Sequence, residues 1–339
     1  MLNYFPVRES GPSDRLQKRV VGNYVNIVNT SVNPAETRGF ALALGSLPDK
    51  LLAPSFEVLS SVLDCLIRTA RYDALVGEEA DAETRRNAVL SLTRMCATVG
   101  VGRGSKNSVY PSVALTSEMA GQIFDAFLLS LEDYNIDRRG DVGSWSRIAA
   151  MSGLESMTYA AVSYLTCESN GDTIVSSDRP WFDQSMCIRV IGGLLKQFSE
   201  KLDSVRSHAG GCLSRILTCT SPTIPFVPQR DYLLESLQLT PQADGSLKNT
   251  NWANAAVTYR MAMAAADINE FFPFIISGMV ISVGGLGESV TKSSEEALLS
   301  WVRTGPRVGP DSRAALLACG NVQNRLLFVP HGFHISRCV

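Results

Sequence analysis

The sequence predicts an all-α protein built from stacked antiparallel helix pairs, that is, an α-solenoid. Three observations lead to this prediction. Apolar residues recur at helical spacing, glycines and prolines separate the helical segments, and one helical pattern returns along the chain. No segment combines sustained apolar/polar alternation with hairpin turns, so the sequence predicts no strand.

Four segments show the clearest helical periodicity, and they begin at Leu16, Phe56, Ile123 and Val190. Each places apolar residues at i, i+3 or i+4, and i+7, which is typical of a helix with one buried face. In the second segment the stripe consists of Phe56, Leu59, Leu63, Leu66, Ile67 and Ala70. The later stretch "FFPFIISGMVISVGG" is interrupted by Pro273 and Gly278, so we expect a buried helix and no membrane span.

Turn-forming residues separate these helices. Asn33-Pro34 and Pro48 bracket a short helix, and Gly140 and Gly143 precede another. Residues 171–180 and 240–251 are predicted to be polar connections. Pro222, Pro225 and Pro228 end one helix before the next begins.

The pattern Arg-x-x-Ala-x-x-x-Leu accounts for the repetition. Its full copies are Arg85, Ala88, Leu92; Arg147, Ala150, Leu154; and Arg206, Ala209, Leu213, and a variant copy is Arg38, Ala41, Gly45. Ala and Leu share a helix face, where the small Ala lets a partner helix approach, and Arg can bind neighbouring carbonyls or an acidic side chain. We expect each copy to open a helix that a second apolar helix follows. Successive copies lie 47, 62 and 59 residues apart, which indicates HEAT-type or armadillo-type units with insertions.

Composition narrows the class of protein. Of 339 residues, 45% are apolar and 19% are charged, which is enough to bury a core. The formal charge of −2 lacks the basic excess of a surface for nucleic acid or membrane. The eight cysteines form no Cys-x-x-Cys pair and the N-terminal residues contain no long apolar run, so we expect reduced thiols in a cytoplasmic protein without a signal peptide.

No catalytic, metal or cofactor motif stands out. Of three histidines, His208 lies in a repeat helix, whereas His331 and His334 stand in the last nine residues without further ligands. The glycine-rich stretches 99–106 and 282–289 lack the strand–turn–helix context of a phosphate loop. The sequence therefore predicts no catalytic residue, no metal and no cofactor.

The tripeptide Arg139-Gly140-Asp141 raises the question of cell adhesion. Adhesion would need a secreted protein, and the sequence favours a structural role instead. We expect the glycines to permit a tight loop, Asp141 or Ser144 to cap a helix that begins near Trp145, and Trp145 to anchor its first turn. Because solenoids often use such loops for contacts, Arg138, Arg139 and Asp141 are our candidate binding residues.

Four stretches, in order along the chain, resemble the tubulin-folding cofactor D family. They are "TRGFALALGSLP", "RRGDVGSWSRIAAM", "VRSHAGGCLSRIL" with "IPFVPQRDYL", and "NWANAAVTYRMAMAAADINEFFPFIISGMVISVGGLGES". Members of that family are longer, so the resemblance implies the C-terminal portion of such a protein, beginning in the middle of the array. We expect a HEAT-like solenoid over residues 1–305 and an atypical tail, truncated or mispredicted, over 306–339.

The resemblance also implies a function. A family member would be a non-enzymatic chaperone that binds β-tubulin and takes part in assembling the αβ-tubulin heterodimer in the cytoplasm, in association with the cytoskeleton. Its partners would be tubulin-folding cofactors C and E and an Arf-like small GTPase, and the assembly would activate GTP hydrolysis by tubulin. The alternatives are a HEAT scaffold of the transport or phosphatase type, which would not share the four stretches, and an enzyme, which would need a deep polar pocket.

Overall fold

The structure is a computed structural model that describes residues 12–52, 55–73, 81–101, 114–168, 182–241, 250–284 and 287–305. The chain forms two compact units. Unit 1 comprises residues 1–190 and 218–226, and unit 2 comprises residues 191–217 and 227–339. The boundary falls inside one helix, α8 (Gln184–Phe198).

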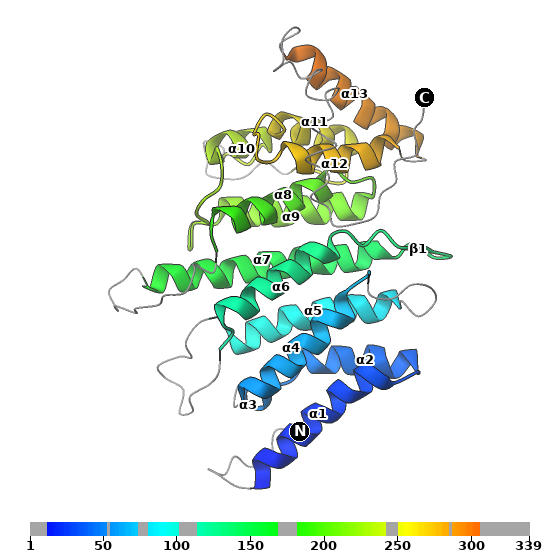
Figure 1. Ribbon diagram of the computed structural model, residues 1–339. Coiled ribbons are helices and arrows are strands. Elements are labelled where there is room, and N and C mark those ends of the chain that lie inside the picture. The colour runs from blue at the N-terminus through cyan, green and yellow to red at the C-terminus, as the bar shows by residue number, and fades with distance from the viewer. Residues whose placement is uncertain are drawn as a thin grey trace. The chain divides into compact units, whose positions relative to one another are not determined.

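Unit 1 consists of helices and one very short hairpin (Figure 1). In chain order its elements are α1 (Pro12–Thr30), α2 (Pro34–Leu44), α3 (Asp49–Leu52), α4 (Phe56–Ala70), α5 (Ala82–Val99), α6 (Ser117–Ser130), β1 (Ile136–Asp137), β2 (Gly140–Asp141), α7 (Gly143–Glu168) and the start of α8. Asn33 caps α2 as its neighbour Pro34 leads us to expect, because its side-chain oxygen accepts a hydrogen bond from the Ala35 amide.

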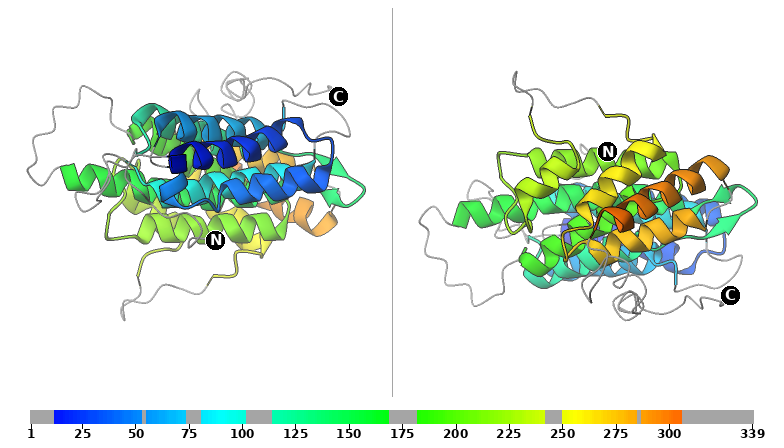
Figure 2. Two further views of the ribbon diagram at one scale, coloured as in Figure 1. Left: turned by 90° about the horizontal axis from the view of Figure 1, so that it is seen from below. Right: turned by 90° about the horizontal axis from the view of Figure 1, so that it is seen from above.

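The helices of unit 1 form two layers (Figure 2). Helix α4 packs against α1 and α6 in one layer, whereas α5 packs against α2 and α7 in the other. The pairs α1–α2, α4–α5 and α6–α7 connect the layers. The second helix of each pair carries the arginine pattern. Our expectation that the arginine helix opens a pair is therefore wrong, because each such helix packs on the helix before it.

The small residues of the pattern do bring the helices together. Ala41, Ala88 and Ala150 are fully buried. The Ser91 hydroxyl in α5 donates a 2.8 Å hydrogen bond to the Ala41 carbonyl in α2. A Cβ atom on Gly45 would collide with Ser91, so the glycine in the variant copy permits this approach.

The hydrophobic core follows the predicted α4 stripe except at Ile67, which is half-buried, and at Phe56. Leu59, Leu63, Leu66 and Ala70 of α4 are buried, but Phe56 is 53% exposed. Phe56 is the first residue of α4, so it extends past the layer against which the rest of the helix packs. The stripe therefore begins at Leu59.

Unit 2 contains the rest of α8, then α9 (Asp203–Thr218), α10 (Arg230–Ser236), α11 (Ala255–Ala265), α12 (Phe272–Val283) and α13 (Glu288–Thr304). Helix α11 packs against α10, α12 and α13, and α12 packs against α13. Pro273 stands in the first turn of α12 and so starts this helix, contrary to its predicted role as an interruption. Glycine at 278 allows close packing, because a Cβ atom there would collide with the Lys196 carbonyl of α8.

The all-α helical-repeat fold is confirmed, because thirteen helices account for nearly all regular structure in the described residues. The prediction of no strands is wrong at one place: Ile136–Asp137 and Gly140–Asp141 pair antiparallel. Among the described residues, no helix is both long enough and apolar enough to cross a membrane. The last described helix ends at Thr304, and the predicted tail 306–339 lies outside the described residues, so that boundary stays a prediction.

Candidate interaction surface

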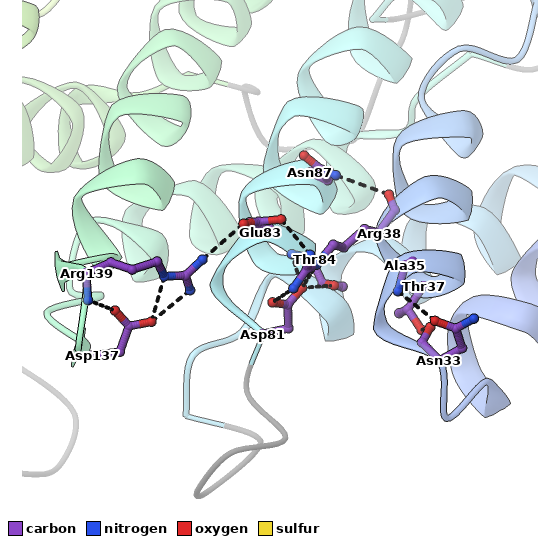
Figure 3. A network of polar contacts seen from close by, with 10 residues as sticks. All are labelled: Asn33, Ala35, Thr37, Arg38, Asp81, Glu83, Thr84, Asn87, Asp137 and Arg139. Carbon is purple, nitrogen blue, oxygen red and sulfur yellow. Dashed lines mark hydrogen bonds and ion pairs between the residues drawn. The ribbon is translucent and has the colours of Figure 1, made fainter.

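One edge of unit 1 carries a chain of charged side chains from three successive repeats (Figure 3). Arg38 comes from α2, Asp81 and Glu83 stand at the start of α5, and Asp137 and Arg139 belong to the β1–β2 hairpin. We refer to these five residues as the charged edge.

The charged edge is continuous from one repeat to the next. The Arg38 guanidinium donates to both carboxylate oxygens of Asp81, each at 2.7 Å, and lies 2.8 Å from Glu83. Glu83 in turn accepts a 3.0 Å hydrogen bond from Arg139, which also donates to Asp137 at 2.7 Å. Every charge in the row therefore has an opposite charge beside it.

These contacts shift the protonation equilibria of the row. Burial acts to raise the pKa of Asp81, but hydrogen bonds from Arg38 and Thr84 outweigh it and lower the pKa from 3.8 to about 2. The hydrogen bond to Asp81 raises the pKa of Arg38, and the hydrogen bond from Arg139 lowers the pKa of Asp137. These shifts favour the charged forms of Asp81, Asp137 and Arg38 at neutral pH.

A second, buried row lies behind the charged edge. The Arg85 guanidinium donates to Asp133 at 2.9 Å, and both side chains are almost completely buried. Arg147, fully buried, lies 3.0 Å from Asp141, donates a 2.6 Å hydrogen bond to the Asp133 carbonyl and covers the ring of Tyr134. The prediction that pattern arginines bind carbonyls and acidic side chains is confirmed.

The three candidate binding residues do not form one site. Asp141 points inward, where it binds Arg147 and accepts a 3.1 Å hydrogen bond from the Ser144 amide. It is therefore the predicted helix cap, and the helix starts at Gly143, slightly before the predicted Trp145. Arg139 is held in the charged edge, whereas Arg138 is exposed and makes no hydrogen bond or ion pair with the residues that the structure describes.

The hairpin is shaped to expose its turn. Gly140 has a φ of 103°, a conformation that a side chain would strain, and this explains the glycine between Arg139 and Asp141. Ile136 is 71% exposed on the same hairpin. Trp145 is half-buried under the Arg139 guanidinium, which lies 4.9 Å from its ring centroid. The outer residues of the turn, Ile136 and Arg138, are thus presented to solvent on a fixed base.

Unit 2 holds its pattern arginine in another way. The fully buried Arg206 donates to the carbonyls of Glu200, Lys201 and Ala253 at 2.7–2.9 Å. Tyr259, also buried, donates a 3.1 Å hydrogen bond to the Glu200 carbonyl. Asp203 contacts Arg206 as well, but its side chain is 70% exposed. This cluster ties α9 to the segment before α11.

The described residues contain no group of three or more His, Cys, Asp or Glu side chains arranged to hold a metal. His208 lies in α9, as predicted, and His331 and His334 lie outside the described residues. Sequence reasoning missed Asp81, Glu83 and Asp133. A partial signal was available: Asp81 and Glu83 stand within four residues before Arg85, near the expected start of a repeat helix, where an acidic side chain can cap the helix.

Comparison with known proteins finds similarity to the same family that the four sequence stretches resemble. Residues 188–323 match a family model described as the C-terminal part of tubulin folding cofactor D. A curated relative from Dictyostelium discoideum, "Tubulin-specific chaperone D", is 22% identical over 296 residues, which cover 83% of this chain. The alignment covers 19% of the relative, so the chain spans about a fifth of that protein's length.

A crystal structure of an engineered protein aligns with 84% of this chain and 99% of its own, at 13% identity and a TM-score of 0.37. That similarity is too low to carry a conclusion. The resemblance to tubulin-folding cofactor D is confirmed by the family model and the curated relative, and it concerns the C-terminal-type region of that chaperone family.

Proposed function

We propose that this chain is the tubulin-binding C-terminal portion of a cofactor D-type chaperone, which binds β-tubulin during assembly of the αβ-tubulin heterodimer. One observation carries the proposal: the match to the cofactor D C-terminal family over residues 188–323, continued by alignment to a tubulin-specific chaperone over 83% of the chain. A tubulin chaperone acts without catalysis of its own, and stacked helix pairs offer an extended surface for such a client.

The proposal extends to the assembly around the client. Cofactors C and E and an Arf-like small GTPase would be the partners, and the complete assembly would stimulate GTP hydrolysis by tubulin in the cytoplasm, near the cytoskeleton. The exposed turn of the β1–β2 hairpin supplies a first contact, because Ile136 and Arg138 face solvent while the residues beside them hold the turn in place.

Binding of β-tubulin by the purified 339-residue chain tests the proposal. We expect the two proteins to co-elute in size-exclusion chromatography with a dissociation constant of roughly micromolar or tighter. Replacing Ile136 and Arg138 together (I136D/R138E) should weaken binding about tenfold, since both residues are exposed and their loss leaves the packing intact.

Lys50→Glu is the matched control, because Lys50 is exposed on α3, away from the hairpin, and its change should leave binding within about twofold. A folded chain that does not bind β-tubulin would contradict the proposed function. Equal binding by I136D/R138E and the parent chain would show that the hairpin does not contact β-tubulin, but it would not contradict the proposed function.

A further inference from the structure

Helix α5 of unit 1 has an open face that the repeat contacts do not use. Arg86, Arg94 and Ala97 are exposed, with Leu90 and Thr93 partly exposed between them. At 100° and 1.5 Å per residue, Arg86 and Arg94 lie within an arc of about 80° and are separated by roughly 12 Å along the axis. The two arginines thus lie on the same side of the helix, one at each end of a short stretch that contains Leu90.

The neighbouring helices keep this face accessible. Helix α5 lies between α2 and α7, and the arginine pattern aligns the three helices residue by residue. The positions matching Arg86 and Leu90 are Gly39 and Ala43 in α2, and the positions matching Leu90 and Arg94 are Ser152 and Ser156 in α7. Small side chains therefore flank Arg86 on the α2 side and Arg94 on the α7 side, whereas Ile148 stands at the α7 position that matches Arg86.

The acidic residues that the structure describes around α5 already have partners. Asp81 and Glu83 pair with Arg38 and Arg139 in the charged edge, and Asp133 pairs with Arg85 in the buried row. Glu155 lies on the corresponding face of α7 and already interacts within the molecule.

Arg86 and Arg94 differ from all of these arginines, since their guanidinium groups make no hydrogen bond or ion pair with the described part of the chain. Within the described residues their positive charge therefore has no acidic partner, although the chain as a whole is slightly acidic.

We propose that the open face of α5 binds an acidic, extended segment of a protein partner, with Arg86 and Arg94 as the two anchors. A guanidinium binds a carboxylate through two parallel hydrogen bonds. An extended chain rises about 3.3 Å per residue, so roughly four residues span the distance between the arginines. The small residues of α2 beside Arg86 and of α7 beside Arg94 leave room for that backbone, and Leu90 contacts its apolar parts. This inference does not depend on the partner being tubulin.

A fluorescent peptide containing six consecutive glutamates, added to the full chain, tests the inference by anisotropy. We expect saturable binding that weakens as salt is raised, because the contacts are exposed ion pairs. The R86Q/R94Q variant should bind about tenfold more weakly. The R19Q/K50Q variant removes the same charge from exposed positions on α1 and α3 and should stay within about twofold of the parent.

Circular dichroism of both variants establishes that they fold like the parent. A peptide with six glutamines in place of the glutamates should not bind. Equal weakening in the two double variants, or binding of the glutamine peptide, would overturn the inference. Tighter binding of a single-stranded oligonucleotide than of the glutamate peptide, lost in R86Q/R94Q, would also overturn it, since the face would then be a nucleic-acid site.

Discussion

The two units solve the same problem, a buried arginine in a repeat helix, with different partners. In unit 1 Arg85 is matched by the buried carboxylate of Asp133, and Arg147 by that of Asp141. In unit 2 Arg206 is matched chiefly by backbone carbonyls, and its carboxylate partner Asp203 is mostly in solvent. The pattern thus fixes the arginine and its helix but leaves the counter-charge to the local loop.

This difference predicts which substitutions should destabilise each unit most. A buried ion pair depends on both partners, because removing one leaves an unpaired charge away from water. A guanidinium held by several carbonyls depends on its own hydrogen-bond geometry and little on any single acidic residue. The following substitutions test this contrast.

Among the charged residues, the largest effect is expected from Asp133→Ala in unit 1. It leaves the buried Arg85 without its carboxylate and should lower the free energy of unfolding by about 3–5 kcal/mol. Asp203→Ala in unit 2 is the matched change and should cost less than about 1 kcal/mol, because its ion pair is solvent-exposed. Urea denaturation measures both values, and similar losses would contradict the contrast.

Arg206→Met should come next, at about 2–4 kcal/mol, because it leaves the Glu200, Lys201 and Ala253 carbonyls short of a donor. Arg206→Lys keeps the charge but not the fork that reaches three acceptors. It should therefore recover less than half of that loss. Full recovery by lysine in urea denaturation would show that charge alone holds this site.

Two tryptophans, one in each unit, extend the comparison from charged residues to apolar packing. Trp301 in unit 2 is 6% exposed and donates a 2.9 Å hydrogen bond to Asp267, so Trp301→Ala should cost about 3–5 kcal/mol. Trp145 is half-buried and covered on one face by Arg139, so Trp145→Ala should cost about 1–3 kcal/mol. Thermal and urea unfolding of the two variants measure which substitution lowers the free energy of unfolding more. A larger decrease for Trp145→Ala would contradict this prediction and would show that Trp145 is the packing anchor of its turn.

The smallest expected effect is the loss of stability at acidic pH that comes from protonation of Asp81. Because the pKa of Asp81 is lowered in the folded state, its contribution is complete above about pH 4 and is lost as pH falls towards 2. We expect about 1–2 kcal/mol from this source, since the charged edge is partly exposed. Asp81→Asn should be less stable than the parent at pH 6, and the difference should vanish near pH 2. A constant difference across that range would refute the assignment.

The sequence predicted what depends on local pattern. The helices and the packing role of the repeat's alanines follow from spacing within a single helix, whereas the burial of Arg85, Arg147 and Arg206 was not predicted. The pairing of Asp133 with Arg85 and of Asp81 with Arg38 could not be read from the sequence, because the partners lie 48 and 43 positions apart. The open face of α5 was also missed, since Arg86 and Arg94 differ from Arg85 only in how they are placed once neighbouring repeats have packed.

The β1–β2 hairpin was missed for another reason. Strands of two residues are too short to show an apolar/polar alternation. Gly140 and Asp141 are also equally typical of the residues that precede and cap a helix. The cap was correctly predicted for Asp141, whose inward contact with Arg147 excludes it from any exposed binding role. Of the predicted binding residues, Arg138 and Arg139 are both exposed, but Arg139 is bound to Asp137 and Glu83, whereas Arg138 makes no hydrogen bond or ion pair with the described residues.

Hydrogen–deuterium exchange of the full chain, with and without β-tubulin, tests the central claim that this helical array is a tubulin-binding surface. We predict slower exchange in peptides that cover the β1–β2 hairpin when β-tubulin is present, with no change in peptides from the buried cores of α4 and α6. Unchanged exchange in every peptide at saturating β-tubulin would contradict the claim.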